Sequence, residues 1–253
     1  MATAREVKKG IILAAGEGTR LRPLTLETPK VLLPVKGIPL ICHTLAWLKS
    51  HGISQVAMNL YHLGEKIADF LGDGSRFGME IGYSEEEQLL GTAGGVKRMA
   101  DGFRETFVVV YGDDLTNLDL AAMAQFHARV GAMATIAVQE VQDATGKGVV
   151  RLGEEGRIQS FVEKPTLGSK SACLINAGVY VLEPGILKHI QPGSSDFGVD
   201  VFPRLLEGGS PVYGWELRPW EYFIDIGTPE AYQQANEDMA RGGVDVAPGR
   251  VSR

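Results

Sequence analysis

The sequence is poor in cysteine and histidine and has no long apolar run. Its 253 residues include two cysteines and five histidines. Cys42 and Cys173 lie far apart, outside CxxC or metal-ligand spacing, which excludes a disulfide framework and a zinc site. The longest apolar run is too short to cross a bilayer or to act as a signal peptide, and only a polar leader precedes Gly10. We therefore expect a cytoplasmic protein without a membrane partner.

An excess of positive charge is also missing. Lysine and arginine number 25 against 31 aspartates and glutamates, which gives a formal net charge of -6. Charged residues make up 22% and hydrophobic residues 44%, as in a soluble globular enzyme and unlike a nucleic-acid-binding protein. The composition predicts no nucleic-acid partner, and any anion site must be local.

Short β-rich runs alternate with segments of helical period in the first half of the chain. Gly10 to Ala15 and Gln55 to Leu60 are typical of buried strands, and the apolar positions between Pro39 and Ser50 share one helical face. This pattern predicts an α/β fold with a mostly parallel mixed sheet flanked by helices. From about residue 134, strands follow one another with fewer helices. We expect one domain over residues 8–240, with halves at 8–133 and 134–240, and a tail at 241–253.

A glycine-rich loop, Gly16-Glu17-Gly18-Thr19-Arg20, directly follows the first predicted strand. Glycines there allow backbone N–H groups to converge on an anion. The spacing is not GxxxxGK[ST], and Leu21 stands where GxGxxG needs its third glycine. Arg20 and Lys30 add positive charge, and the prolines of this segment stiffen it. We interpret it as a polyphosphate-binding loop; a turn with solvated charges is the alternative.

Two aspartates stand at or within apolar, strand-like runs. Asp113 follows the run Phe107 to Tyr111, and Asp225 lies within a later one. In open α/β sheets, ligand sites lie beyond the carboxyl ends of the strands. Carboxylate oxygens suit Mg²⁺, which takes one or two protein carboxylates together with phosphate oxygens. The pair therefore favours a magnesium site, although Asp113 alone is also compatible with a helix cap or turn.

The sequence from residue 13 to residue 41, LAAGEGTRLRPLTLETPKVLLPVKGIPLI, closely resembles the amino-terminal signature of the sugar-1-phosphate nucleotidylyltransferases. Further similar segments follow in order: LGTAGG (90–95), GDD (112–114), FVEKP (161–165), INAGVY (175–180) and IDIGTPEAY (224–232). The resemblance implies a Rossmann-like nucleotide-diphospho-sugar transferase fold. It also implies a Mg²⁺-dependent reaction of a nucleoside triphosphate with a sugar-1-phosphate that yields a nucleotide-sugar and pyrophosphate. Residues 8–133 would bind the nucleotide, and residues 134–240 the sugar phosphate.

The resemblance also implies roles for single residues. Arg20 matches the arginine on the triphosphate and departing pyrophosphate, and Lys30 matches the lysine that bridges the attacking phosphate and the α-phosphate. Asp113 and Asp225 match the metal ligands, and these four form the expected catalytic set. The expected nucleotide contacts are Leu13, Ala15, Gly16, Gly18, Thr19, Arg20, Glu86, Gly91 and Thr92.

On the sugar side, Lys164 matches a lysine that holds the sugar phosphate, and Glu163 a carboxylate on sugar hydroxyls; a solvated salt bridge is the alternative for this pair. Asn176 matches an amide on the sugar hydroxyls. The expected sugar-phosphate contacts are Gly95, Glu163, Lys164, Asn176 and Gly178. Three residues depart from the family pattern. Ala177 stands where serine or threonine is common, and Phe223 where tryptophan is common. Asp114 stands where asparagine is common, so the role of Asp114 is left open.

The base is predicted from Glu86, which lies where pyrimidine-transferring relatives often have a glutamine. A carboxylate only accepts hydrogen bonds, so it suits the N1–H and N2–H donors of guanine. LGTAGG also resembles the guanylyltransferases acting on mannose-1-phosphate or a heptose phosphate. The segment LGDGSRFGMEIGYS (71–84) is instead similar to uridylyltransferases acting on N-acetylmuramate-1-phosphate. We favour GTP with mannose-1-phosphate or a related sugar phosphate; uridylyl or thymidylyl transfer is the alternative.

Two other function classes compete with this enzyme. A catalytically silent regulatory subunit that binds nucleotide-sugar would have lost a cation or a metal ligand, and both are present. A glycosyltransferase of similar fold would lack the GTR motif and the Pro-Lys pair. The sequence does not settle the sugar, or whether the chain forms homo-oligomers.

Overall fold

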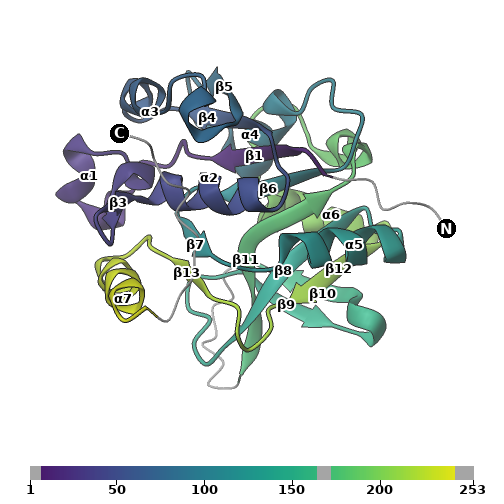
Figure 1. The fold of residues 1–253 in the computed structure, drawn as a ribbon. Helices are drawn as coiled ribbons and strands as arrows, with labels where there is room; N and C mark the ends of the chain where they lie inside the picture. Colours follow the sequence, from purple (N-terminus) through teal and green to yellow (C-terminus); the bar gives the residue numbers. More distant parts are fainter. Residues whose placement is uncertain (1–6, 164–171, 243–253) are drawn as a thin grey trace. The chain divides into compact units, whose positions relative to one another are not determined.

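The structure, a computed structural model, describes residues 7–163 and 172–242 (Figure 1). These residues form two compact units. Of the described residues, unit 1 contains 7, 90–109, 119–163 and 172–219, and unit 2 contains 8–89, 110–118 and 220–242. Neither unit is one continuous stretch of chain. The division of residues 8–240 into halves at 133/134 stays a prediction.

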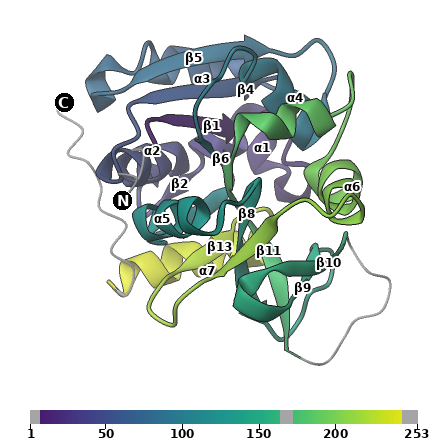
Figure 2. The ribbon, with the colours of Figure 1, turned by 90° about the vertical axis from the view of Figure 1, so that its right-hand side faces the viewer.

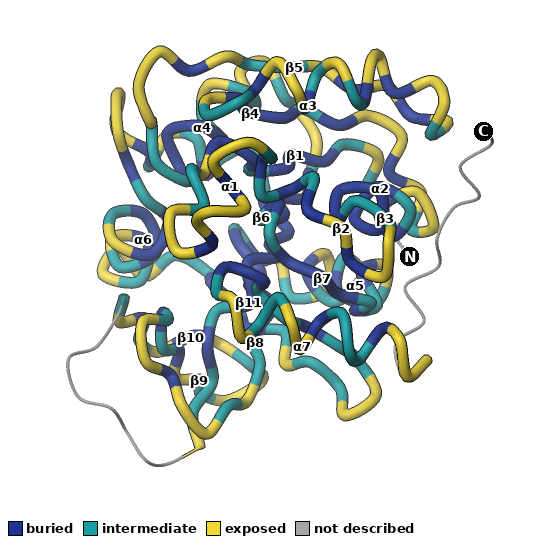
Figure 3. Tube along the Cα trace, turned by 90° about the vertical axis from the view of Figure 1, so that its left-hand side faces the viewer, coloured by how far each residue is buried: buried dark blue, intermediate teal, exposed yellow. Residues whose placement is uncertain are grey.

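The centre of unit 2 is a parallel βαβαβ arrangement. Strands β1 (Lys9–Leu13), β4 (Gln55–Leu60) and β5 (Glu80–Glu85) pair in that order, all parallel. Helix α2 (Leu40–Ser50) connects the first two, and helix α3 (Gly64–Leu71) the last two. The middle of β1 and most of α2 are buried, as the dark trace in Figure 3 shows. Burial of this apolar strand and helix face explains why the sequence pattern predicted the arrangement.

Short elements complete unit 2. Between β1 and α2 lie η1 (Thr19–Leu21), α1 (Leu24–Glu27), η2 (Lys30–Leu32) and the two-stranded β2 (Pro34–Val35) and β3 (Ile38–Pro39). A further turn, η3 (Ser75–Phe77), precedes β5. Strands β7 (Asp114–Thr116) and β13 (Phe223–Asp225) pair antiparallel. Helix α7 (Pro229–Ala240) follows β13, and its first turn is capped by the Thr228 hydroxyl, which accepts from the N–H of Ala231 at 3.2 Å.

Unit 1 contains a mainly antiparallel set of strands (Figure 2). Strands β10 (Ile158–Val162), β9 (Val149–Leu152), β11 (Cys173–Leu182) and β8 (Ala134–Val141) pair antiparallel in that order. Strand β12 (Val212–Glu216) pairs parallel to β8. The register of β11 on β8 shifts between Asn176 and Tyr180, which marks a bulge there.

The helical elements of unit 1 are α4 (Gly91–Met99), α5 (Leu120–Val130), η4 (Glu154–Gly156), η5 (Pro184–His189), the π-helical turn η6 (Phe197–Val201) and α6 (Phe202–Glu207). An aromatic cluster fills its core: Tyr180, Phe197 and Phe202 have ring centroids 5.2–5.3 Å apart. Strand β6 (Phe107–Tyr111) begins in unit 1 and ends in unit 2.

The predicted fold class, a mostly parallel mixed sheet flanked by helices, is confirmed. Strands β4 and β6 have the predicted bounds. Residues 197–207 form a π-helical turn followed by a short α-helix, with Pro203 in the first turn of that helix, where a missing N–H costs no hydrogen bond. No helix in the described part of the chain is long and apolar enough to cross a membrane.

Candidate active site

The glycine-rich loop after β1 folds back onto Lys30. Gly18 has a φ of 62°, a left-handed conformation that favours glycine. Its carbonyl accepts from the Thr25 hydroxyl at 2.8 Å, and a Cβ added to it would lie 2.9 Å from Thr25 Cγ2 and 3.4 Å from Lys30 Cβ. Thr19 and Arg20 are exposed at the start of η1. The loop therefore leaves the side chains of Thr19 and Arg20 exposed, while Gly18 beside them packs closely against Thr25 and Lys30.

Lys30 and Asp113 form an ion pair, although 83 residues separate them in the sequence. The side chains are mostly buried, with 13% and 18% of their surface exposed. Gly112 sets the direction of the chain here: its N–H donates to the Leu13 carbonyl at 2.8 Å, and an added Cβ would come within 2.8 Å of that same oxygen. Glycine is thus required at the end of β6, and Asp113 follows directly from it.

Asp225 completes an acidic cluster with Asp113 and Asp114. The register of β13 on β7 sets Asp225 opposite Asp114, and one oxygen from each of the three carboxylates lies within 4.8 Å of the others. The Oδ1 atom of Asp225 accepts from the N–H of Gly227 at 2.7 Å. An added Cβ at Gly227 would lie 2.6 Å from Arg20 Nη2 and 2.8 Å from that Oδ1. Gly227 therefore lets the Arg20 guanidinium approach the cluster.

The charges of the cluster act on one another. Burial alone would raise the pKa of Asp113, but the Lys30 ammonium beside it outweighs this, and its pKa lies below the usual value. Burial also opposes the charge of Lys30, yet Asp113 keeps the pKa of that lysine raised. Burial and then the negative charge of Asp113 raise the pKa of Asp225. One lysine does not neutralise this set, and clustered hard oxygens of this kind fit a divalent cation.

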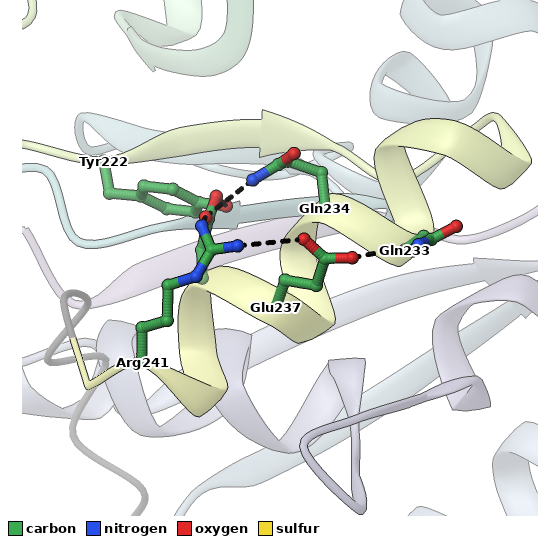
Figure 4. A network of polar contacts seen from close by, with 6 residues as sticks. Tyr222, Gln233, Gln234, Glu237 and Arg241 are labelled. Carbon is green, nitrogen blue, oxygen red and sulfur yellow. Dashed lines mark hydrogen bonds and ion pairs between the residues drawn. The ribbon is translucent and has the colours of Figure 1, made fainter.

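A polar network anchors the chain just before Asp225 (Figure 4). The Tyr222 hydroxyl donates to Asp238 Oδ2 at 3.0 Å, and its N–H donates to Asn117 Oδ1 at 2.6 Å. Burial, then the bond to Asp238, raises the pKa of this tyrosine. Around it on α7, Gln234 donates to Asp238, and Gln233 and Arg241 donate to Glu237. The network ties β13 to α7 and to the end of β7, and so holds Asp225 in place.

Glu86 lies just after β5 and is only 7% exposed. Its Oε1 accepts from Asn59 Nδ2 at 2.9 Å, and its N–H donates to the Leu60 carbonyl at 2.8 Å. Both partners lie at the carboxyl end of β4. The carboxylate expected to contact the base is thus fixed through main chain and side chain, rather than being a solvated charge.

In unit 1, the first turn of α4 is bonded to the segment before η6. Gly91 has a φ of 71°. The N–H and hydroxyl of Thr92 donate to Asp196 Oδ1 at 3.1 and 2.9 Å, and that hydroxyl accepts from the N–H of Phe197 at 3.0 Å. Gly95 is buried within the same helix. Asp196 therefore accepts from the N–H of Thr92 in the first turn of this helix, and the Ser195 carbonyl accepts from the next two N–H groups, those of Ala93 and Gly94.

Glu163 lies in a slot between two glycines. An added Cβ would come within 2.7 Å of its Oε2 at Gly148 and closer still at Gly198. In the bulge of β11, Asn176 donates to the Tyr180 hydroxyl at 2.8 Å and accepts from the N–H of Gly178 at 3.1 Å. The amide expected on the sugar thus also stabilises the bulge. Lys164 lies outside the described residues.

Comparison with known proteins places these features in a family. The family described as "Nucleotidyl transferase" matches residues 9–242. The chain belongs to this family. It is 36% identical to a UTP--glucose-1-phosphate uridylyltransferase of Synechocystis, over 95% of this chain and 68% of the relative. It is equally identical to a mannose-1-phosphate guanylyltransferase of Mycobacterium tuberculosis, over 96% and 67%.

Solved structures agree with the fold of this nucleotidyl transferase. A Bacillus anthracis chain described as a glucose-1-phosphate thymidylyltransferase matches with a TM-score of 0.84 and 28% identity, over 97% of this chain and 98% of that one. A protein named HddC from Yersinia pseudotuberculosis, complexed with GMP-PN, matches with a TM-score of 0.77 and 25% identity, over 92% and 100%. The predicted enzyme class, sugar-1-phosphate nucleotidyl transfer, is confirmed at this level.

The structure brings four predicted residues of the nucleotidyl transferase together: Arg20, Lys30, Asp113 and Asp225. Glu86 is held separately by Asn59. Leu13 and Ala15 end β1 and begin the loop, and Gly16 is exposed in it. The roles predicted for all these residues, and for Gly91, Thr92, Gly95, Glu163, Asn176 and Gly178, stay predictions.

Sequence reasoning missed two supporting residues of the nucleotidyl transferase. Asn59 is 3% exposed at the end of an otherwise apolar strand, and Asp196 bonds the first turn of α4. A polar residue at the carboxyl end of a buried parallel strand is a signal that could have indicated Asn59. Asp196 lies 104 residues from Thr92, and no local pattern connects them.

Proposed function

We propose that the enzyme transfers the guanylyl group of GTP to mannose-1-phosphate or a related sugar-1-phosphate, with Mg²⁺. The buried carboxylate of Glu86, held by Asn59, carries the choice of base. A carboxylate accepts hydrogen bonds from the N1–H and N2–H groups of guanine and repels the carbonyls that flank the N–H of uracil or thymine. The mannose-1-phosphate guanylyltransferase among the relatives supports this substrate pair.

In the proposed reaction, a phosphate oxygen of the sugar-1-phosphate forms a bond to the α-phosphorus of GTP. The bond from that phosphorus to the bridging oxygen breaks, and pyrophosphate leaves with the electron pair. Two polyanions meet in this step, so alignment and charge neutralisation are the main tasks of the protein. Lys30 would align the attacking phosphate and the α-phosphate, and Arg20 would stabilise the departing pyrophosphate.

The acidic cluster fits a magnesium ion. Three carboxylates lie close together beside one lysine, and burial and then the negative charge of Asp113 raise the pKa of Asp225. Asp113 and Asp225 would hold the ion, which supplies charge neutralisation of the phosphates when bound. In unit 1, we assign the sugar hydroxyls to Glu163, whose carboxylate is oriented by its glycine slot, and to Asn176. Lys164 would hold the sugar phosphate.

The test is a matrix of five nucleoside triphosphates against several sugar-1-phosphates, with pyrophosphate release as the readout, in Mg²⁺ and in EDTA. We expect the largest kcat/KM for GTP with mannose-1-phosphate or a close relative of it, and none in EDTA. A maximum with UTP or dTTP would contradict the guanine assignment and favour the pyrimidine alternative, to which the Synechocystis relative points. If no combination of triphosphate and sugar-1-phosphate released pyrophosphate, and a nucleotide-sugar bound tightly, the result would favour a silent regulatory subunit.

A further inference from the structure

We infer that Thr25 is a positioning residue of the glycine-rich loop. Its hydroxyl fixes the peptide that joins Gly18 to Thr19, so that the N–H of Thr19 donates to the phosphates that leave as pyrophosphate. This inference rests on the proposed function, which assigns the loop to the triphosphate, and adds a residue to it. Thr25 acts through the main chain of the loop and not on the substrate itself.

Helix α1 buries its threonine and exposes its leucines. Thr25 is 0% exposed, whereas Leu24 and Leu26 on either side of it are 49% and 55% exposed. Burial of a hydroxyl costs free energy unless the hydroxyl forms a hydrogen bond, whereas apolar side chains fill an interior without that cost. The burial of Thr25 in place of its neighbours therefore indicates that its hydroxyl has a task. That hydroxyl donates to the Gly18 carbonyl at 2.8 Å.

The Gly18 carbonyl accepts a second hydrogen bond, from the N–H of Leu21 at 2.9 Å. A carbonyl oxygen has two lone pairs, and both are thus occupied. The peptide unit between Gly18 and Thr19 is planar and trans, so its N–H points away from its carbonyl. Because the carbonyl is fixed on η1 and α1, the N–H of Thr19 is directed to the opposite side. Thr19 itself is exposed.

Two side chains from the segment after β4 hold α1 in turn. His62 Nε2 lies 3.0 Å from the Thr25 carbonyl, and because a carbonyl only accepts, this nitrogen carries the proton and donates. Lys66 Nζ, from α3, donates to the Glu27 carbonyl at 2.6 Å. Helix α1 is therefore attached to the chain around α3 at two points, and Thr25 holds the loop from a fixed base.

Without the Thr25 hydroxyl, only the bond from Leu21 would hold this peptide. Gly18 has a φ of 62° and no Cβ, so its backbone rotates more freely than that of other residues. A rotated peptide would present its carbonyl oxygen, which repels phosphate, in place of the N–H, which attracts it. The loop would then bind the phosphates of the departing pyrophosphate more weakly, while contacts to the base and the sugar would stay unchanged.

Two matched pairs isolate the hydroxyl. Thr25→Val replaces the hydroxyl of the natural protein by a methyl group of similar size, and Thr25→Ser and Thr25→Ala differ from each other only in the hydroxyl. Calorimetry in Mg²⁺ gives the Kd of each protein for inorganic pyrophosphate, GTP and GMP. Within each pair, we expect loss of the hydroxyl to raise Kd for pyrophosphate and GTP by about 10-fold, the effect of one unsatisfied buried acceptor. Kd for GMP, which lacks those phosphates, and KM for the sugar-1-phosphate should not change.

Thr44→Val is the control, because it removes a buried hydroxyl from α2 that donates to the Leu40 carbonyl at 3.4 Å. Its Kd values should match those of the natural protein. An equal Kd for pyrophosphate within both pairs would overturn the inference, and so would an equal rise for GMP, which would indicate a general change of fold. If Thr25→Val does not fold, as judged by thermal unfolding, the serine and alanine variants decide alone.

Failure of the proposed function is a separate result. The natural enzyme would then release no pyrophosphate with any combination of triphosphate and sugar-1-phosphate. A natural enzyme that prefers UTP would refute the guanine assignment. The comparison of Kd values for inorganic pyrophosphate needs neither a base nor a sugar, so it decides the role of Thr25 in both cases.

Discussion

The polar groups of the two compact units are balanced in different ways. In unit 2, three aspartates gather near one lysine, and the pKa of Asp225 is raised by burial and by the charge of Asp113. In unit 1, donors meet acceptors within the chain: Thr92 bonds Asp196, and Asn176 bonds Tyr180. Unit 2 therefore carries a charge excess that a ligand can relieve, whereas the polar groups named in unit 1 are already satisfied.

A buried histidine of unit 1 makes the contrast clear. His127 contacts the Thr135 hydroxyl at 2.9 Å and Glu183 at 3.3 Å, and Thr106 donates to the same glutamate at 2.5 Å. Burial lowers the pKa of His127 in spite of this glutamate, so the neutral ring is favoured. Satisfied polar clusters specify a fold, and unbalanced ones are typical of sites that bind charged ligands. We expect unit 2 to bind the metal ion and the triphosphate through its unbalanced charge, and unit 1 to bind the sugar through side chains that are already held in position.

The largest expected effect is on turnover in Asp225→Asn. The amide keeps an acceptor for the N–H of Gly227, so the loop should stay folded, but the cluster loses one charged metal ligand. We expect kcat to fall by about 100-fold or more, the range for losing one group that stabilises transition-state charge. Nucleotide binding, measured by calorimetry, should remain detectable. Full activity in Mg²⁺ would refute the assignment of Asp225 as a metal ligand. Asp69→Asn, an exposed change on α3 of the same unit, is the control.

Some strands and helices could be predicted from the sequence, and others could not. Strands β1, β4 and β6 were predictable because each is a buried apolar run between turn residues, and the ends of such strands indicated Asp113 and the loop. Helix α5 and strand β12 were not predicted. The first is rich in alanine and has few large apolar side chains, and the second contains a glycine, so their patterns are weak.

Other parts of the site could not be predicted from the sequence for a different reason. The ion pair of Lys30 with Asp113, the bond of Asn59 to Glu86 and the slot around Glu163 join residues distant in the sequence. Local periodicity contains no information on such contacts. The resemblance to a family indicated most residues of the site, but it did not indicate which groups hold them in position.

A smaller effect is expected from Gly198→Ala in unit 1. The new methyl group would collide with the Glu163 carboxylate and displace it from its slot. If Glu163 accepts hydrogen bonds from the sugar hydroxyls, KM for the sugar-1-phosphate should rise about 10-fold, the cost of losing roughly one hydrogen bond to a charged group, with KM for the triphosphate unchanged. Gly82→Ala, where an added Cβ meets nothing within 4 Å, is the control. A rise confined to the triphosphate KM would show that Glu163 does not serve the sugar.

The smallest expected effect is on the stability of Asp225→Asn. We expect this variant to gain stability, although it loses turnover. The pKa of Asp225 is raised in the folded protein by burial and by Asp113, so folding favours its protonated form. Such a group contributes stability below its unfolded pKa of about 4, and this contribution is lost as the pH rises through the folded pKa. Asp225→Asn stays neutral throughout. Without metal, it should therefore be more stable than the natural protein at pH 7, by on the order of 1 kcal/mol.

Thermal unfolding in EDTA at a series of pH values checks this difference. The gain of Asp225→Asn should grow as the pH rises above about 4 and then level off. Added Mg²⁺ should stabilise the natural protein more than the variant, because the ion binds the folded cluster and offsets its repulsion. Asp69→Asn should show neither trend. A variant that is less stable than the natural protein at pH 7 in EDTA would mean that the carboxylates of unit 2 are balanced within the chain, as the polar groups of unit 1 are.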